Sequence, residues 1–212
     1  MRGTTARGRR DGGWSPTRKL LASIAVLGAA ASIAGLGTFA TFTSSTSASH
    51  TVSSGTVTIA LGATGAATNR LTVGASAIAP GDTIQRSVDL INSGSIDLAS
   101  VTLTTTATTS SLLDTDTSNG LQMVIDKCSN AWTEAGPPYT YSCSGSTSSV
   151  LTTRPVVGST LALSNLGSLT NGMTDHLRVT LTLPGTAGNT LQSQSSTISY
   201  AFTGTQRTAT NK

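Results

Sequence analysis

The sequence predicts an all-β fold, a jelly-roll-like antiparallel β-sandwich preceded by an N-terminal signal helix. Three observations predict it: several runs alternate between apolar and polar residues, threonine fills the polar positions, and clusters of Gly, Pro, Asn and Ser separate the runs. Alternation of period two is typical of a strand with one face in a core and the other in water. Beyond the leader we expect no helix longer than a single turn, in residues 110–116.

Five alternating runs supply the strands. In chain order their inward sets are Val57, Ile59 and Leu61; Ile84, Val88 and Leu90; Val101 and Leu103; Leu177, Val179, Leu181 and Leu183; and Ile198, Tyr200 and Phe202. The outward threonines are β-branched and tolerate water, so they favour strands without creating an apolar surface. These strands must form two packed sheets, because one open sheet would leave an apolar face uncovered. We expect the domain to span residues 56–204, with a frayed tail at 205–212.

The first 40 residues indicate export. Basic residues up to Lys19 precede a charge-free apolar segment, residues 20–40, and this order is typical of a signal peptide. Small residues at its end predict cleavage between Ala40 and Thr41, followed by a flexible polar tether at 41–55. The alternative is a retained membrane anchor, because about 20 apolar residues span a bilayer. The segment is rich in Ala and Gly, which favours cleavage.

Charge excludes a nucleic-acid partner. The 212 residues carry a net charge of +4, but seven basic and eight acidic groups follow residue 40, so the exported part carries −1. Neutralisation of phosphates by Lys and Arg dominates nucleic-acid affinity, and no basic stripe is present. Contact with a membrane is expected through the leader alone.

Two cysteines in an exported chain predict one disulfide, Cys128–Cys143. The bond closes a loop of about 15 residues, for which chain entropy gives a stabilisation of roughly 3 kcal/mol. The loop carries Trp132, Tyr139 and Tyr141. We expect these rings to cover the edge of the core beneath the loop; exposed, they would suit a passive binding module such as an adhesin.

Catalytic and metal sites are not expected. His50 and His176 are the two histidines, and no H-E-x-x-H segment is present to hold a metal. We therefore predict no enzyme activity, no catalytic residue and no cofactor, and we interpret His176 with Asp175 as a solvated turn pair. The segment Asp114–Gly120 partly matches a calcium loop, but Ile125 stands where a bidentate Glu is required. An Asx-rich turn is the favoured interpretation.

Four segments, in this order, resemble the TasA/camelysin family of exported bacterial matrix proteins. They are the leader ending GLGTFATFTSS, the run SSGTVTIAL, the stretch APGDTIQRSVDLINSGSIDLASVTL and the ending LTLPGTAGNTLQSQSSTISYAFTGTQR. The resemblance implies a leader cut by a SipW-type signal peptidase and a jelly-roll subunit of a biofilm fibre. Its partners would be copies of itself or related matrix subunits. Some members of the family are described as metallopeptidases.

The resemblance also implies assembly by donor-strand exchange, in which one subunit lends a strand to the next. That role falls on Thr56, Val57, Thr58, Ile59, Ala60 and Leu61. The polar tether before this run would let the run pack on its own subunit or on a neighbouring subunit. The sequence therefore predicts a secreted structural subunit of an extracellular matrix fibre. The alternatives are a cell-surface adhesin and a camelysin-like metallopeptidase.

Overall fold

The computed structural model describes residues 54–72 and 74–210, together with Thr17. In chain order the elements of this part are β1 (Ile59–Leu61), β2 (Thr83–Asn92), β3 (Leu98–Thr109), α2 (Leu112–Thr115), β4 (Gln122–Cys128), β5 (Thr133–Ala135), β6 (Thr140–Ser142), β7 (Thr147–Pro155), β8 (Gly158–Ala162), β9 (Thr174–Thr182), the 3-10 helix η1 (Asn189–Leu191) and β10 (Thr197–Gln206). None of the described helices has the length and apolar character needed to cross a membrane. The predicted leader, the Ala40–Thr41 cleavage site and the tether up to residue 53 lie outside the described residues.

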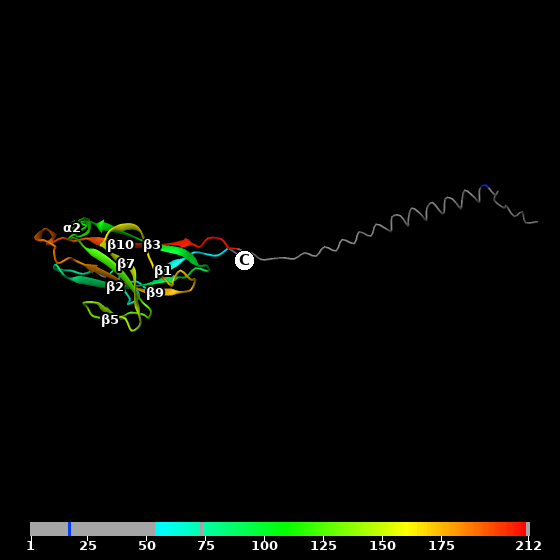
Figure 1. Cartoon of the computed structure of the whole chain (residues 1–212), viewed down its shortest axis with the longest axis horizontal. Coiled ribbons are helices and arrows are strands. Elements are labelled where there is room, and N and C mark those ends of the chain that lie inside the picture. Colours follow the sequence, from blue (N-terminus) through cyan, green and yellow to red (C-terminus); the bar gives the residue numbers. More distant parts are fainter. Residues whose placement is uncertain (1–16, 18–53, 73, 211–212) are drawn as a thin grey trace, which may run out of the picture. The chain divides into compact units, whose positions relative to one another are not determined.

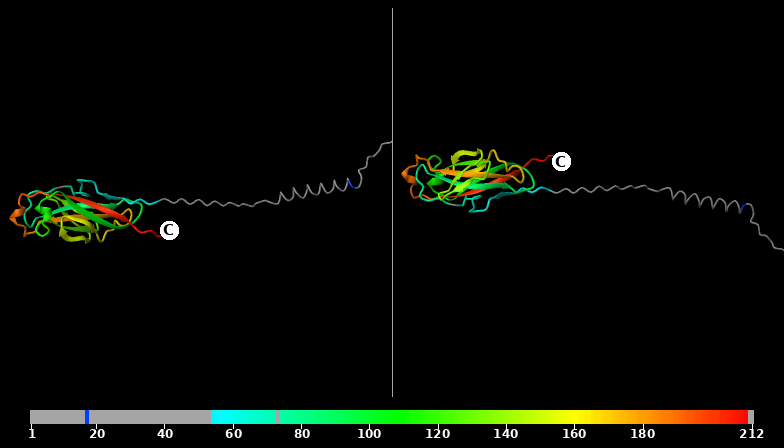
Figure 2. Two further views of the ribbon diagram at one scale, coloured as in Figure 1. Left: turned by 90° about the horizontal axis from the view of Figure 1, so that it is seen from above. Right: turned by 90° about the horizontal axis from the view of Figure 1, so that it is seen from below.

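Two antiparallel sheets form the sandwich (Figure 1). One has the order β1-β2-β9-β4-β7 and the other the order β10-β3-β8. Figure 2 shows the sandwich from two opposite sides, with the strands of both sheets along its length. This arrangement confirms the predicted all-β fold, because each sheet buries its apolar face against the other.

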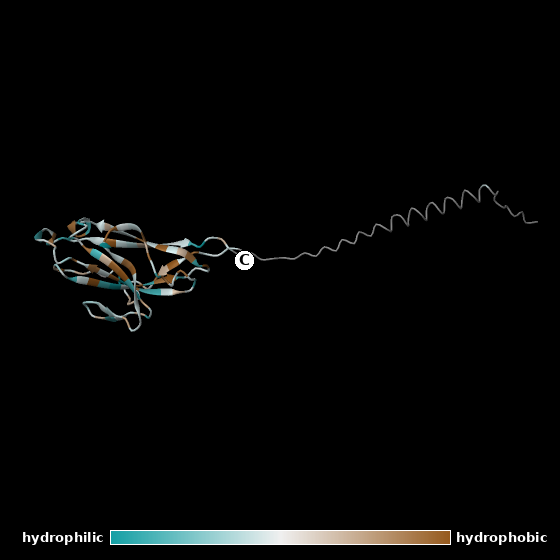
Figure 3. Cartoon of the chain, viewed as in Figure 1, coloured by the Kyte–Doolittle hydropathy of each residue, from teal (hydrophilic) through white to brown (hydrophobic). Residues whose placement is uncertain are grey.

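The core lies between the sheets, and the alternation of the sequence places it there. Apolar and polar residues alternate along the strands in Figure 3. The inward residues on β2, β3, β4 and β9 include the most deeply buried side chains of the described chain, namely Val88, Leu90, Val101, Leu103, Met123, Ile125, Leu177 and Val179. The predicted inward residues of β2, β3 and β9 are therefore confirmed except for Ile84, which is not part of the core; Leu183 is buried but follows the end of β9.

The first strand is shorter than the sequence predicts. β1 begins at Ile59, whereas the alternating run begins at Thr56, and Val57 is 39% exposed instead of inward. The reason is that its partner β2 ends at Asn92, where the chain turns away. The residues before β1 still bond to this turn: Ser95 N–H donates to the carbonyl oxygen of Thr56 at 3.0 Å, and Thr56 N–H donates to Ser95 Oγ at 2.9 Å.

Two further boundaries compare with the prediction as follows. The expected single helical turn is α2, which begins after a capping box between Ser111 and Asp114. At the other end, β10 runs to Gln206, two residues beyond the predicted end of the domain at 204. The extension has a partner, because Gln206 pairs with Leu98 at the start of β3.

Candidate functional site

β10 is the end strand of the smaller sheet, and among the described residues β3 is the one strand that pairs with it. The other edge of β10 therefore faces away from its sheet. Its side chains Ile198, Tyr200 and Phe202 pack against the core but stay partly exposed. β1 pairs with β2 and not with β10, so the described strands leave the sandwich unsealed between β1 and β10.

A cleft of about 1230 Å³ opens along this unsealed side. Both sheets contribute to its apolar lining, which includes Leu61, Leu71, Ile78, Ile84, Leu181, Leu183, Leu191, Ile198 and Tyr200. Arg86 is the one charged residue among the described residues that line it. Burial raises the pKa of Tyr200 to about 12. The cleft thus combines apolar side chains from both sheets with polar side chains, many of them in residues 192–199, beside a strand edge that has no second partner among the described strands.

The chain between β1 and β2 forms one wall of this cleft. Its first half is fixed on β2, since Asn69 bridges Val88 and the Arg70 N–H donates to the carbonyl oxygen of Ser87 at 2.9 Å. Residues 71, 72 and 74–78 then follow the cleft. Arg86 holds this stretch, because its Nη2 donates to the carbonyl oxygen of Gly74 at 2.7 Å.

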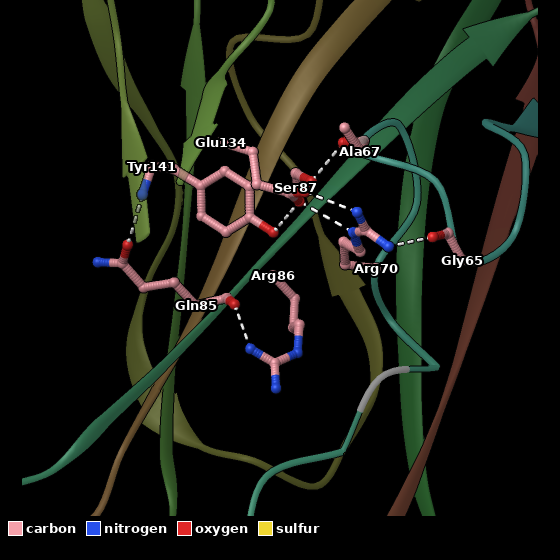
Figure 4. Close-up of polar contacts among 8 residues, drawn as sticks. All are labelled: Gly65, Ala67, Arg70, Gln85, Arg86, Ser87, Glu134 and Tyr141. Carbon is pink, nitrogen blue, oxygen red and sulfur yellow. Dashed lines mark hydrogen bonds and ion pairs between the residues drawn. The ribbon is translucent and has the colours of Figure 1, made fainter. Parts of the chain in front are cut away.

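A polar cluster lies behind this wall (Figure 4). Arg70 donates to Glu134 through Nε at 2.9 Å and Nη2 at 2.6 Å, and it also donates to the carbonyl oxygen of Gly65. The Tyr141 hydroxyl donates to Glu134 Oε2 at 2.8 Å. The hydrogen bonds from Arg70 lower the pKa of Glu134, with a further contribution from Tyr141, so the carboxylate is held ionised against its burial. A bidentate pair of this kind is geometrically specific.

Glu134 and Tyr141 belong to the hairpin β5–β6, which the disulfide closes. Cys128 and Cys143 are bonded as the cysteine count predicts, with their Cα atoms 5.7 Å apart. In Figure 1 the hairpin lies beneath β2 and β9. It covers the outer face of the larger sheet, where Trp132 Nε1 donates to the carbonyl oxygen of His176 at 2.9 Å and the Arg178 guanidinium stacks 4.4 Å from the Trp132 ring.

The aromatic residues of the hairpin therefore pack against the protein. Tyr141 is buried, and Trp132 and Tyr139 are half-buried. They cover the outer face of a sheet, whereas the sequence led us to expect the edge of the core. An exposed aromatic binding loop, on which the adhesin interpretation depended, is not what the structure contains.

A family model described as camelysin metallo-endopeptidase matches residues 16–211 of the chain. The chain belongs to the camelysin family. This match confirms the resemblance that the four sequence segments carry. No curated protein matches the chain.

The camelysin name implies a metal, and the donors in the described part of this camelysin chain do not fit one. No three His, Cys, Asp or Glu residues there lie close enough together to hold an ion. His176 Nδ1 contacts Asp89 Oδ1 at 2.7 Å, while His50 lies outside the described residues. No catalytic step through a metal follows from these residues.

The turn Asp114–Gly120 uses its carboxylates for internal hydrogen bonds. Asp114 accepts from Ser111 N–H at 2.7 Å and from the Ser196 hydroxyl at 2.6 Å. Asp116 accepts from the N–H groups of Ser118 and Asn119. This is the Asx-rich turn that the sequence favours.

Sequence reasoning missed the cleft, Arg70, Arg86 and the free edge of β10. A weak signal was present, because Arg70 and Arg86 are two of only seven basic residues after residue 40. Isolated cations in a domain of such low charge are expected to have specific partners. Their partner ring and carboxylate, however, lie more than 45 residues away in the sequence.

Proposed function

We propose that this protein is a secreted, non-enzymatic structural subunit of an extracellular or biofilm matrix fibre, assembled by donor-strand exchange. The donated segment would be Thr56–Leu61, and the acceptor would be the free edge of β10 with the cleft beside it. The partner is a second copy of the chain or a related matrix subunit. The observation that carries the proposal is the juxtaposition of an edge strand with a cleft of about 1230 Å³ to which both sheets contribute apolar side chains.

Main-chain and side-chain physics both support this acceptor. An added strand hydrogen-bonds to the main chain of an exposed edge, while alternate side chains fill pockets beside it. Val57, Ile59 and Leu61 alternate in this way and would face the apolar lining of the cleft. Full burial of each such side chain is worth roughly 1.5 to 3 kcal/mol. Together these terms favour stable association.

The home position of the segment is compatible with exchange. β1 pairs with β2 over three residues, and Ile59 and Leu61 are half-buried there. Ile59 already reaches toward β10, since a Cβ atom on Gly204 would lie 2.5 Å from its Cδ1. Release of the segment would break this ladder and the hydrogen bonds to the carbonyl oxygens of Thr56 and Thr58, and pairing with the edge of β10 would replace them. The structure thus has the segment in one of the two positions that the proposal requires.

The test introduces a charge on each face of the donated segment. Ile59→Asp would place an unpaired carboxylate in the apolar cleft of the next subunit, so fibres should be absent. Thr58→Asp is the matched control, because Thr58 lies on the opposite, exposed face and the variant should still form fibres. Negative-stain microscopy of the exported proteins gives the readout. A peptide of residues 55–61 should also block growth of wild-type fibres.

Three outcomes would change the assignment. If Ile59→Asp unfolds the subunit and the peptide has no effect, β1 belongs to its own core and a monomeric surface protein becomes the better interpretation. If a chain that begins at Ser53 already fails to polymerise, the donated residues lie before Ser53 and not in Thr56–Leu61. If the wild-type protein forms no fibres alone or with a related matrix subunit, the fibre proposal is wrong.

A further inference from the structure

We propose that Tyr139 is a positioning residue for the acceptor cleft: its ring holds the Arg86 guanidinium at the rim and so keeps a charge out of the path of an incoming strand. This inference rests on the proposed function. Tyr139 lies in the tip of the disulfide-closed hairpin, between β5 and β6. Its ring centroid is 4.8 Å from Arg70 Cζ and 5.4 Å from Arg86 Cζ.

The backbone of β2 directs Arg86 toward the interior. Arg86 alternates in phase with Ile84, which lines the cleft, and with Val88, which lies in the core, and it stands opposite the buried Val179 of β9 in the ladder. Without other contacts a guanidinium at this position would enter the apolar cleft. A charge there is costly unless paired, and it would meet the apolar side chains of a donated strand.

In the structure the Arg86 side chain lies at the border of the cleft, which it lines. Arg86 Nη1 donates to the carbonyl oxygen of Gln85 at 2.6 Å and Nη2 to that of Gly74 at 2.7 Å, while its guanidinium lies over the Tyr139 ring. At Arg86 the edge of β2 has no β1 residue beside it, because β1 pairs only with residues 90–92, and the cleft wall borders the edge there. The side chain therefore has a route to the outer face, where the hairpin lies.

The ring also contacts a second cation. Arg70 and Arg86 both approach Tyr139. The negative face of an aromatic ring attracts both, and the Glu134 carboxylate binds Arg70. The wall is thus held at Arg70 by Glu134 and at Gly74 by Arg86, and both guanidinium groups contact the Tyr139 ring.

The test compares Tyr139→Ala with Tyr139→Phe in the exported protein. A fluorescent peptide of residues 41–61 serves as the probe, and its dissociation constant is measured by anisotropy. Tyr139→Ala should weaken binding by about fivefold to thirtyfold, because two cation–π contacts are lost. Tyr139→Phe keeps the ring, so its affinity should stay within about twofold of wild type. Trp132→Ala, which loosens the same hairpin over β9, should have a smaller effect than Tyr139→Ala.

A second change separates this role from simple support of the hairpin. In the Tyr139→Ala background, Arg86→Gln removes the charge that would enter the cleft, so it should restore most of the lost affinity. If Arg86→Gln fails to restore binding, or if Tyr139→Phe binds as weakly as Tyr139→Ala, the inference is wrong. If the wild-type protein and the Tyr139→Ala variant bind the peptide with the same affinity, this inference alone is wrong. If the wild-type protein neither binds the peptide nor forms fibres, the proposed function and this inference are both wrong.

Discussion

At the scale of single residues, Asp175 shows how far a local interpretation can fail. With His176 it resembles a solvated turn pair, yet Asp175 is 4% exposed and lies on the inward face of β9. It accepts hydrogen bonds from the N–H groups of Gly167 at 3.0 Å and Ser168 at 2.8 Å, and Lys127 Nζ lies 3.2 Å away. The alternation of the strand predicts the inward direction. The loop that supplies the two N–H groups is a tertiary feature that no local pattern encodes.

These contacts make Asp175 a source of pH-dependent stability. Burial opposes its ionisation, but the hydrogen bonds from Ser168 and Gly167 outweigh burial and lower its pKa below the usual 3.8. A carboxyl whose pKa is lowered on folding stabilises the fold above its unfolded pKa, and that contribution is lost as pH falls through the folded value. Asp175→Asn should therefore lower the free energy of unfolding at pH 7 by about 1.5 to 3 kcal/mol, the typical worth of a hydrogen bond to a charged group.

Denaturant unfolding at pH 7 and below pH 3.8 checks this expectation. The difference between wild type and Asp175→Asn should narrow as pH falls below 3.8, because the unfolded carboxyl binds its proton first and the folded carboxyl follows as pH falls through its lowered pKa. Asp97→Asn is the control, since Asp97 is exposed and accepts one hydrogen bond, from Asn171 N–H at 2.9 Å. An equal difference at both pH values would contradict the assignment of the effect to ionised Asp175.

At the scale of elements, the sequence predicts the disulfide that closes the β5–β6 hairpin but not the ion pair that joins this hairpin to Arg70. Cysteine count and export predict the Cys128–Cys143 bond, and the aromatic content of the loop predicts that it covers something apolar. The pair Arg70–Glu134 joins residues 64 positions apart. Nothing in the spacing of either residue indicates the other, because side-chain pairing across elements depends on how the hairpin folds back onto the sheet.

Replacing both cysteines with serine tests the role of the bond. The loop closure is lost, so the free energy of unfolding should fall by about 2 to 4 kcal/mol. The far-UV circular dichroism spectrum should remain β-rich, because the two main sheets contain neither β5 nor β6. Thiol titration of the exported wild-type protein is the companion measurement, and free thiols there would contradict the bond. Loss of the β spectrum in the double variant would show that the hairpin supports the sheets themselves.

At the scale of the whole molecule, the sequence pattern predicts that two sheets pack together, but it does not predict the order of the strands within each sheet. Period-two alternation specifies which face of a strand is buried, and this is enough to require two packed sheets. It does not specify which strands become neighbours. The pairing of β1 with β2 in place of β10 could therefore not be predicted, and the cleft follows from that pairing. For the same reason the sequence predicts Val57 to face inward. Its run alternates, but β2 ends at Asn92 opposite Ile59, so no residue of β2 pairs with Val57.

A chain that begins at Gly62 tests whether this open side joins subunits. It would keep β2 to β10 and the edge of β10, but it would lack the segment to be donated. It should therefore accept a strand from a growing fibre and offer none in return. Added at a small fraction of the wild-type concentration, it should stop growth at one fibre end, which seeded growth followed by light scattering and microscopy would detect.

Circular dichroism must first show that the chain beginning at Gly62 folds, since Ile59 and Leu61 pack against the core. Preincubation with the peptide of residues 41–61 is the control, because an occupied cleft should abolish the inhibition. If a folded chain of this kind leaves fibre growth unchanged, the edge of β10 is not where subunits join.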